Sequence, residues 1–176
     1  MIDAVEIRSP GETHIEVHKF YSGAVTAVVV LALVVQTLLP VYLRRAELLE
    51  LPLLVTIYFG ISRRNPSRGL LLGMIIGLLQ DSLSHKPLGL NGMAKTCIGY
   101  LASSVGGRID TEHPLSRFAF TAALMAVQQC VIVLIRRLLL AQPERFFSMR
   151  FLAAMGVNSV IAVALFALLD RLRKPS

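Results

Sequence analysis

Charged and amide side chains inside or beside apolar stretches are the residues of this sequence that could do chemistry. Asp81 ends one apolar stretch. Lys95 would lie roughly 9 Å along a helix from Gly89 if residues 88–107 are helical. The two opposite charges would then have comparable depth, so we expect a buried pair or hydrogen-bond cluster of Asp81, Asn91 and Lys95. Because charges within a membrane are energetically costly, such a cluster is expected to have a purpose. The functional alternatives are an ion path, a ligand site or a partner contact, and the structural alternative is a clamp between two helices.

The sequence carries no enzymatic signature. Of its four histidines, His14 and His18 alone have the helical spacing that suits a shared metal ion, and they lie in a mixed-charge N-terminal segment. Ser82, Ser84 and His85 are close together but lack a nucleophile elbow. No phosphate-binding P-loop is present. We therefore expect a protein that is not an enzyme, with no catalytic residue, no cofactor and no metal.

The elements that position these residues are expected to be membrane helices. The 176 residues are 55% hydrophobic and 16% charged, whereas a soluble domain is nearer a quarter charged. A crossing takes about 20 apolar residues, so six crossings would leave only short loops and no room for a soluble catalytic domain. The six predicted helices are 21–43, 51–61, 69–79, 88–107, 118–140 and 151–169. The expected fold is an all-α bundle in which 21–170 is a single domain.

Two of these stretches, 51–61 and 69–79, are marginal for a full crossing. They are either two tilted spans or a helical hairpin that dips into the membrane, and both alternatives return the chain to the same side. The parity of the remaining helices is therefore unaffected by the choice.

The basic residues are expected to set the topology rather than bind nucleic acid. The net charge is +7, but the lysines and arginines stand in short clusters between apolar runs. With the N-terminus inside, ten basic residues fall on the inner side and seven on the outer side. This count favours a cytoplasmic segment at 1–20, a basic cytoplasmic tail at 171–176, and both termini in the cytoplasm.

A face of small residues runs along the third predicted helix. Gly69, Gly73 and Gly77 recur every four residues, and Asp81 continues the same face. Such a face lets a second helix backbone approach closely in lipid. It serves either packing within the chain, which we favour, or a groove for a partner protein.

A second candidate contact region lies between the last two predicted helices. Basic and aromatic residues mix there at an expected membrane interface. Its members are Arg136, Arg137, Arg145, Phe146 and Phe147. The region either anchors to lipid headgroups or docks a protein partner, since exposed Phe and Arg are favoured contact residues.

The block from Gly73 to Tyr100 resembles a known bacterial family. Its pattern is Gly77, then Asp81 four residues on, then Gly89 in a Leu-Gly pair, then Tyr100. In this it is similar to the rod-shape-determining membrane protein family MreD. Chain length, a long first span, a short hairpin and a basic tail fit the family as well.

The resemblance implies a six-helix bundle similar to the substrate-binding subunits of energy-coupling-factor transporters. It also implies a non-enzymatic scaffold in the cytoplasmic membrane that regulates cell shape. The partners implied by the resemblance are an MreC-like protein, the actin-like MreB filament, and the glycosyltransferase and transpeptidase of lateral peptidoglycan synthesis. The rival prediction is a vitamin-capturing subunit of such a transporter, with an outward pocket lined by Asp81, His85, Asn91 and Lys95. A third alternative is an ion-coupled transporter that uses Asp81 and Lys95.

Overall fold

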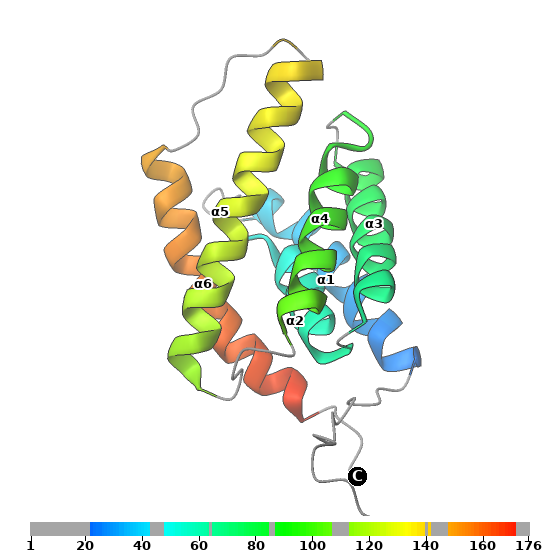
Figure 1. Ribbon diagram of the computed structural model, residues 1–176, viewed down its shortest axis with the longest axis vertical. Helices are drawn as coiled ribbons and strands as arrows, with labels where there is room; N and C mark the ends of the chain where they lie inside the picture. Colours follow the sequence, from blue (N-terminus) through cyan, green and yellow to red (C-terminus); the bar gives the residue numbers. More distant parts are fainter. Residues whose placement is uncertain are drawn as a thin grey trace, which may run out of the picture.

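The computed structural model describes residues 22–42, 48–63, 65–84, 87–106, 113–139, 141 and 148–171. These residues form six α-helices that alternate in direction (Figure 1). The helices are α1 (Ser22–Tyr42), α2 (Leu51–Arg63), α3 (Pro66–Leu83), α4 (Leu90–Val105), α5 (Pro114–Leu139) and α6 (Met149–Asp170). Figure 1 shows α5 and α6 on one side of the bundle and α3 and α4 on the other, with α2 between them.

Three of the six helices in the described residues are long and apolar enough to cross a membrane. They are α1, α5 and α6, and each has lipid-compatible side chains on its outer surface. The expected helices 21–43, 118–140 and 151–169 therefore correspond to observed elements, with ends that differ by a few residues. The chain is a membrane protein in which these three helices are the clearest spans.

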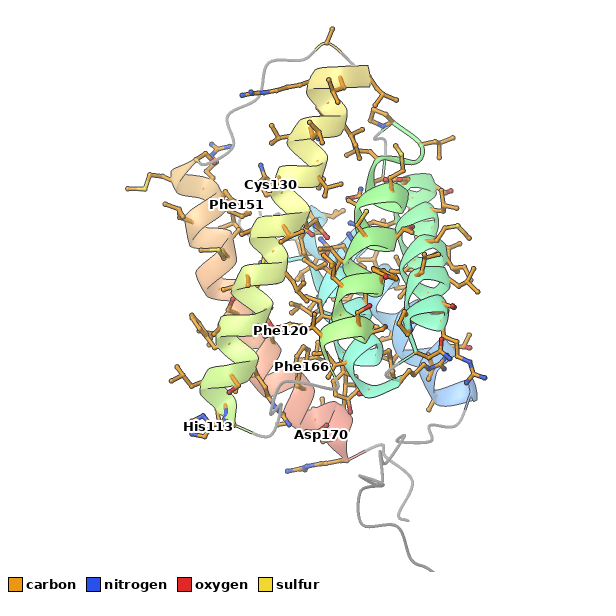
Figure 2. The ribbon with its side chains drawn as sticks, viewed as in Figure 1. His113, Phe120, Cys130, Phe151, Phe166 and Asp170 are labelled. Carbon is orange, nitrogen blue, oxygen red and sulfur yellow. The ribbon has the colours of Figure 1, made fainter. Side chains whose placement is uncertain are left out.

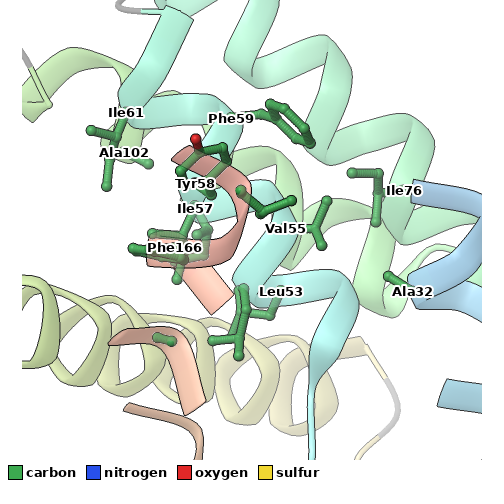
Figure 3. Close-up of a cluster of buried hydrophobic side chains, with 14 of the residues drawn as sticks. Ala32, Leu53, Val55, Ile57, Tyr58, Phe59, Ile61, Ile76, Ala102 and Phe166 are labelled. Atoms are coloured by element: carbon green, nitrogen blue, oxygen red, sulfur yellow. The ribbon is translucent and has the colours of Figure 1, made fainter. Parts of the chain in front are cut away.

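The short helix α2 forms the centre of the bundle. Every residue from Pro52 to Ser62 is buried, so α2 has no polar face and no lipid face. Leu53, Val55 and Ile57 pack with Phe166 of α6 and residues of the other helices in one apolar core (Figure 3). With 13 residues, α2 is about 20 Å long, well short of a hydrocarbon layer of about 30 Å. Its stability comes from neighbouring helices on all sides.

Local residues set where α3 and α6 begin. Asn65 accepts a hydrogen bond from the Arg68 N–H, and Pro66 takes the first helical position, where its missing N–H costs nothing. Ser148 caps α6 in the same way by accepting from the Phe151 N–H. Because of the cap at Asn65, α3 begins three residues before the predicted stretch 69–79. At its other end, α3 extends beyond that stretch to Leu83.

A polar contact fastens the end of the bundle where α6 finishes. The Arg117 guanidinium of α5 donates to the Asp170 carboxylate at 2.6 Å, and the Tyr58 hydroxyl of α2 donates to the other oxygen of that carboxylate at 2.9 Å. Figure 2 shows Asp170 and His113 at this same end of the bundle, with Phe151 toward the opposite end of α6. One carboxylate thus joins three helices.

Candidate functional site

The predicted glycine face of α3 lies against α4. A Cβ added at Gly73 would overlap the carbonyl oxygen of Lys95, and one at Gly77 would lie 2.7 Å from the Cα of Gly92. At Gly69 the added Cβ would meet the side chain of Ser103. The two backbones are therefore in direct contact, and this helix pair has the most extensive contact in the described part of the chain. The face is filled from within the chain, which leaves no groove there for a partner.

Asp81 holds the beginning of α4 from the end of α3. Its Oδ2 accepts from the Gly89 N–H at 2.9 Å and from the Gly92 N–H at 3.1 Å. Its Oδ1 accepts from the backbone and side-chain N–H groups of Asn91, at 3.2 and 2.8 Å. A carboxylate from one helix thus caps the N-terminus of the next, where the helix dipole favours negative charge. Gly89 has φ of +94°, a conformation that glycine adopts readily, and it exposes its N–H to Asp81.

We expect Asp81→Asn to destabilise the protein by about 2 kcal/mol or more, because an amide nitrogen would replace one carboxylate oxygen and face two buried N–H donors. The measurement is thermal unfolding of the purified protein in mild detergent. Ser82→Ala is the matched control, since the exposed Ser82 hydroxyl bonds to Leu78 of its own helix. Unchanged melting of Asp81→Asn relative to this control would show that the cap contributes little.

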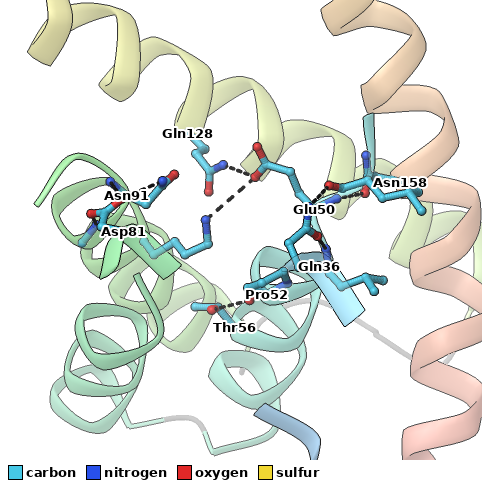
Figure 4. Close-up of polar contacts among 12 residues, drawn as sticks. Gln36, Glu50, Pro52, Thr56, Asp81, Asn91, Gln128 and Asn158 are labelled. Carbon is cyan, nitrogen blue, oxygen red and sulfur yellow. Dashed lines mark hydrogen bonds and ion pairs between the residues drawn. The ribbon is translucent and has the colours of Figure 1, made fainter. Parts of the chain in front are cut away.

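Lys95 pairs with a different carboxylate from the one that we expected. Its side chain is fully buried, and Nζ lies 3.8 Å from Oε2 of Glu50, just before α2. The same Glu50 oxygen accepts from the Gln128 amide of α5 at 2.5 Å. Asp81 and Asn91 bond to each other (Figure 4), whereas Lys95 pairs with Glu50. The expected three-residue cluster is thus two adjacent groups, the Asp81 cap and a Glu50 site.

The backbone around Glu50 is fixed from two sides. Asn158 of α6 accepts from the Glu50 N–H at 2.8 Å and donates to the Leu48 carbonyl at 2.6 Å. Gln36 of α1 donates to the Leu49 carbonyl at 2.7 Å and accepts from the Leu51 N–H at 3.0 Å. These amides replace water for backbone groups that precede α2, since a membrane interior offers no other partners. Figure 4 shows Gln36, Gln128 and Asn158 around Glu50. Together with Lys95, these residues connect α1, α4, α5 and α6 to the segment before α2.

The residues Glu50, Gln128 and Asn158 are absent from the predicted site. A signal for them exists, because polar side chains within apolar spans are rare and have a structural or functional purpose. Gln128 and Asn158 interrupt two of the predicted spans. Glu50 has no such signal, because it stands among other charged residues before α2.

A cavity of about 280 Å³ adjoins this site. It is lined by the segment before α2, the start of α4, the second half of α5 and the start of α6. The transporter alternative predicts a pocket lined by four residues, of which Asn91 lines this cavity. Asp81 instead caps α4, and Lys95 pairs with Glu50. The fourth residue, His85, lies outside the described residues. The cavity is therefore differently built from the one predicted.

The remaining predicted residues have different surroundings. Tyr100 is 48% exposed on the outer face of α4. Arg136 is half-buried and lines the cavity, and Arg137 is exposed beside it. The other members of the predicted contact region, Arg145, Phe146 and Phe147, lie outside the described residues, as do segment 1–20 and residues 172–176 of the tail.

Comparison with known proteins gives one result. The model of the family described as rod shape-determining protein MreD matches residues 18–174. The matched range begins before α1 and ends after α6, so all six helices lie within it. No curated protein and no solved structure matches the chain.

Proposed function

The chain belongs to the MreD family of rod shape-determining membrane proteins, and we propose that it is a scaffold of the machinery that elongates the cell wall. The observation that carries this proposal is the family match over nearly the whole chain. The family consists of shape-determining structural proteins and is not a known enzyme family. In this proposal the chain acts by holding partners together rather than by catalysis.

The proposed topology has six crossings in the cytoplasmic membrane. Residues 1–20 form a cytoplasmic segment, 21–170 form the bundle, and 171–176 form a basic cytoplasmic tail. The alternating directions of the helices and the ten to seven distribution of basic residues support this topology. A resemblance to the substrate-binding subunits of energy-coupling-factor transporters remains a proposal about the fold.

The proposed partners are an MreC-like protein, the wall-building glycosyltransferase and transpeptidase, and the MreB filament, directly or through another protein. One contact region is the segment of Arg136, Arg137, Arg145, Phe146 and Phe147 between α5 and α6.

A second proposed contact is the exposed face of α4. Of the four motif positions, Gly77, Asp81 and Gly89 have roles in the contact between α3 and α4, whereas Tyr100 is 48% exposed. Met93, Cys97 and Tyr100 recur at helical spacing and are all exposed. Tyrosine is enriched among the residues that dominate binding energy, because it combines a large apolar ring with a hydroxyl. A partner helix or loop at this face would contact Tyr100, the motif side chain that is exposed rather than packed in the core.

We expect cells depleted of this chain to lose their rod shape, and the tagged wild-type protein to recover the MreC-like partner from native membranes in mild detergent. Tyr100→Ala should melt like the wild type and lower that recovery about tenfold or more, because a buried interfacial tyrosine contributes about 2 kcal/mol. Recovery is measured by quantitative mass spectrometry.

The matched control is Leu31→Ala on α1, which also truncates an exposed apolar side chain, 63% exposed. Wild-type recovery in Tyr100→Ala would contradict the contact at α4 alone. Rod shape in fully depleted cells would contradict the scaffold proposal itself.

A further inference from the structure

The cavity beside Glu50 has a lining that suits a particular class of ligand. Its polar side chains are a carboxylate, three amides, a hydroxyl and two guanidinium groups, and apolar residues form the rest of the wall. The side chains used below are Glu50, Gln128, Ile132, Arg136, Arg150 and Phe151. They come from the segment before α2, from the second half of α5 and from the first turn of α6.

The charges of this lining favour an anion. Among the described residues of the lining, Arg136 and Arg150 are the basic members and Glu50, which pairs with Lys95, is the acidic one. Arg150 stands in the first turn of α6, where the helix dipole disfavours a cation, so its position does not serve helix stability. Two guanidinium groups and the N-terminus of a 22-residue helix together form a surrounding in which phosphate is stabilised.

A buried acceptor indicates a second feature of the ligand. Gln128 is 3% exposed and donates through Nε2 to Glu50, while its Oε1 has no hydrogen-bond partner among the described residues. An unsatisfied buried amide oxygen is costly, and a hydroxyl or amine of a ligand would satisfy it. The ligand therefore combines a phosphate with a hydrogen-bond donor.

The position of the cavity along the membrane normal indicates that the phosphate belongs to a lipid headgroup. Arg117 and Arg136 lie at the two ends of α5, 19 residues apart, which corresponds to about 28 Å along the helix. This length matches a hydrocarbon layer of about 30 Å, so both guanidinium groups reach the level of the headgroups. Ile132 and Phe151 extend the cavity wall with apolar surface that an acyl chain can contact.

We propose that this cavity binds the headgroup of one anionic phospholipid. Its phosphodiester lies beside Arg136 and Arg150, and a headgroup hydroxyl is directed to Gln128. Phosphatidylglycerol has this combination, with one negative charge and two hydroxyls. The site is specific and holds one lipid per chain, unlike the general attraction of basic residues to a membrane surface.

The test uses the full-length protein in nanodiscs of phosphatidylcholine with a small fraction of phosphatidylglycerol, followed by native mass spectrometry. We expect one retained phosphatidylglycerol per chain. Arg136→Ala and Arg150→Ala should each lower this retention roughly tenfold, the effect of losing one charge-assisted hydrogen bond. Arg137→Ala is the matched control and should retain the lipid within about twofold of the wild type, because Arg137 is exposed and does not line the cavity. Arg150 is exposed outside the core, so Arg150→Ala is the variant that tests the site if Arg136→Ala folds poorly.

Two further arms examine the ligand itself. Phosphatidylmethanol has the same charge without hydroxyls, so it should be retained several-fold less than phosphatidylglycerol. Soluble glycerol 1-phosphate should not displace the lipid. Equal retention of the two lipids, equal losses in Arg136→Ala and Arg137→Ala, or absence of any retained lipid would overturn the proposal. Displacement by glycerol 1-phosphate would assign the cavity to a soluble phosphate ester instead.

Discussion

Gly73→Ala should separate α3 from α4 and lower the stability of the bundle by about 3 kcal/mol or more, at the upper end of what overpacking costs. The added Cβ would overlap the carbonyl oxygen of Lys95 and lie 2.7 Å from its carbonyl carbon. Both atoms belong to the backbone, so rotation of a side chain cannot relieve the overlap. Thermal unfolding in mild detergent and the yield of monodisperse protein measure the effect.

Gly156→Ala is the matched control for this prediction. Gly156 lies within α6, and an added Cβ there meets no atom within 4 Å. Alanine favours a helix by about 1 kcal/mol over glycine, so this variant should be as stable as the wild type or more stable. Equal melting temperatures for the two alanine variants would mean that α3 and α4 do not need their close approach.

Glu50→Gln should lower the stability of the protein more than Lys95→Met does. It removes the counter-ion of Lys95, a side chain with no exposed surface, and an uncompensated buried charge costs about 3–5 kcal/mol. Lys95→Met should cost clearly less, because the Glu50 side chain is 29% exposed and keeps its bond from Gln128. The inequality follows from the different burial of the two charges.

The double variant Glu50→Gln with Lys95→Met should recover most of the stability lost in Glu50→Gln, since it removes both charges of the pair and leaves neither one uncompensated. Thermal unfolding of the four proteins gives the coupling between the two residues. Losses that simply add in the double variant would contradict the ion pair as a stabilising unit.

Sequence patterns predict the helices of this protein better than its polar contacts. The long apolar runs of α1, α5 and α6 identify those helices directly, and the spacing of Gly69, Gly73 and Gly77 indicates a close helix contact. The same pattern does not say that α2 is buried on every side, because an all-apolar helix looks alike in lipid and in protein. The feature that distinguishes α2 from a lipid-facing span is its length of 13 residues.

The pairing of Lys95 could not be predicted from the sequence because it depends on how distant helices are placed. Asp81 is 14 residues away along the chain and at a similar depth, so it is the natural partner by sequence. Asp81 is instead satisfied by N–H groups at the start of α4. Glu50, which is 45 residues from Lys95, reaches it because Gln36 and Asn158 hold the backbone on both sides of Glu50.

The central position of α2 has a consequence for how the protein is made. The helix is synthesised early, yet the Glu50 backbone before it requires Asn158, and its core requires Phe166, both from the last helix. A nascent chain that ends before α6 lacks these partners for α2 and for the backbone before it. Final assembly of the bundle is therefore coupled to the synthesis of α6, because the backbone around Glu50 and the core around α2 are completed only when that helix is present.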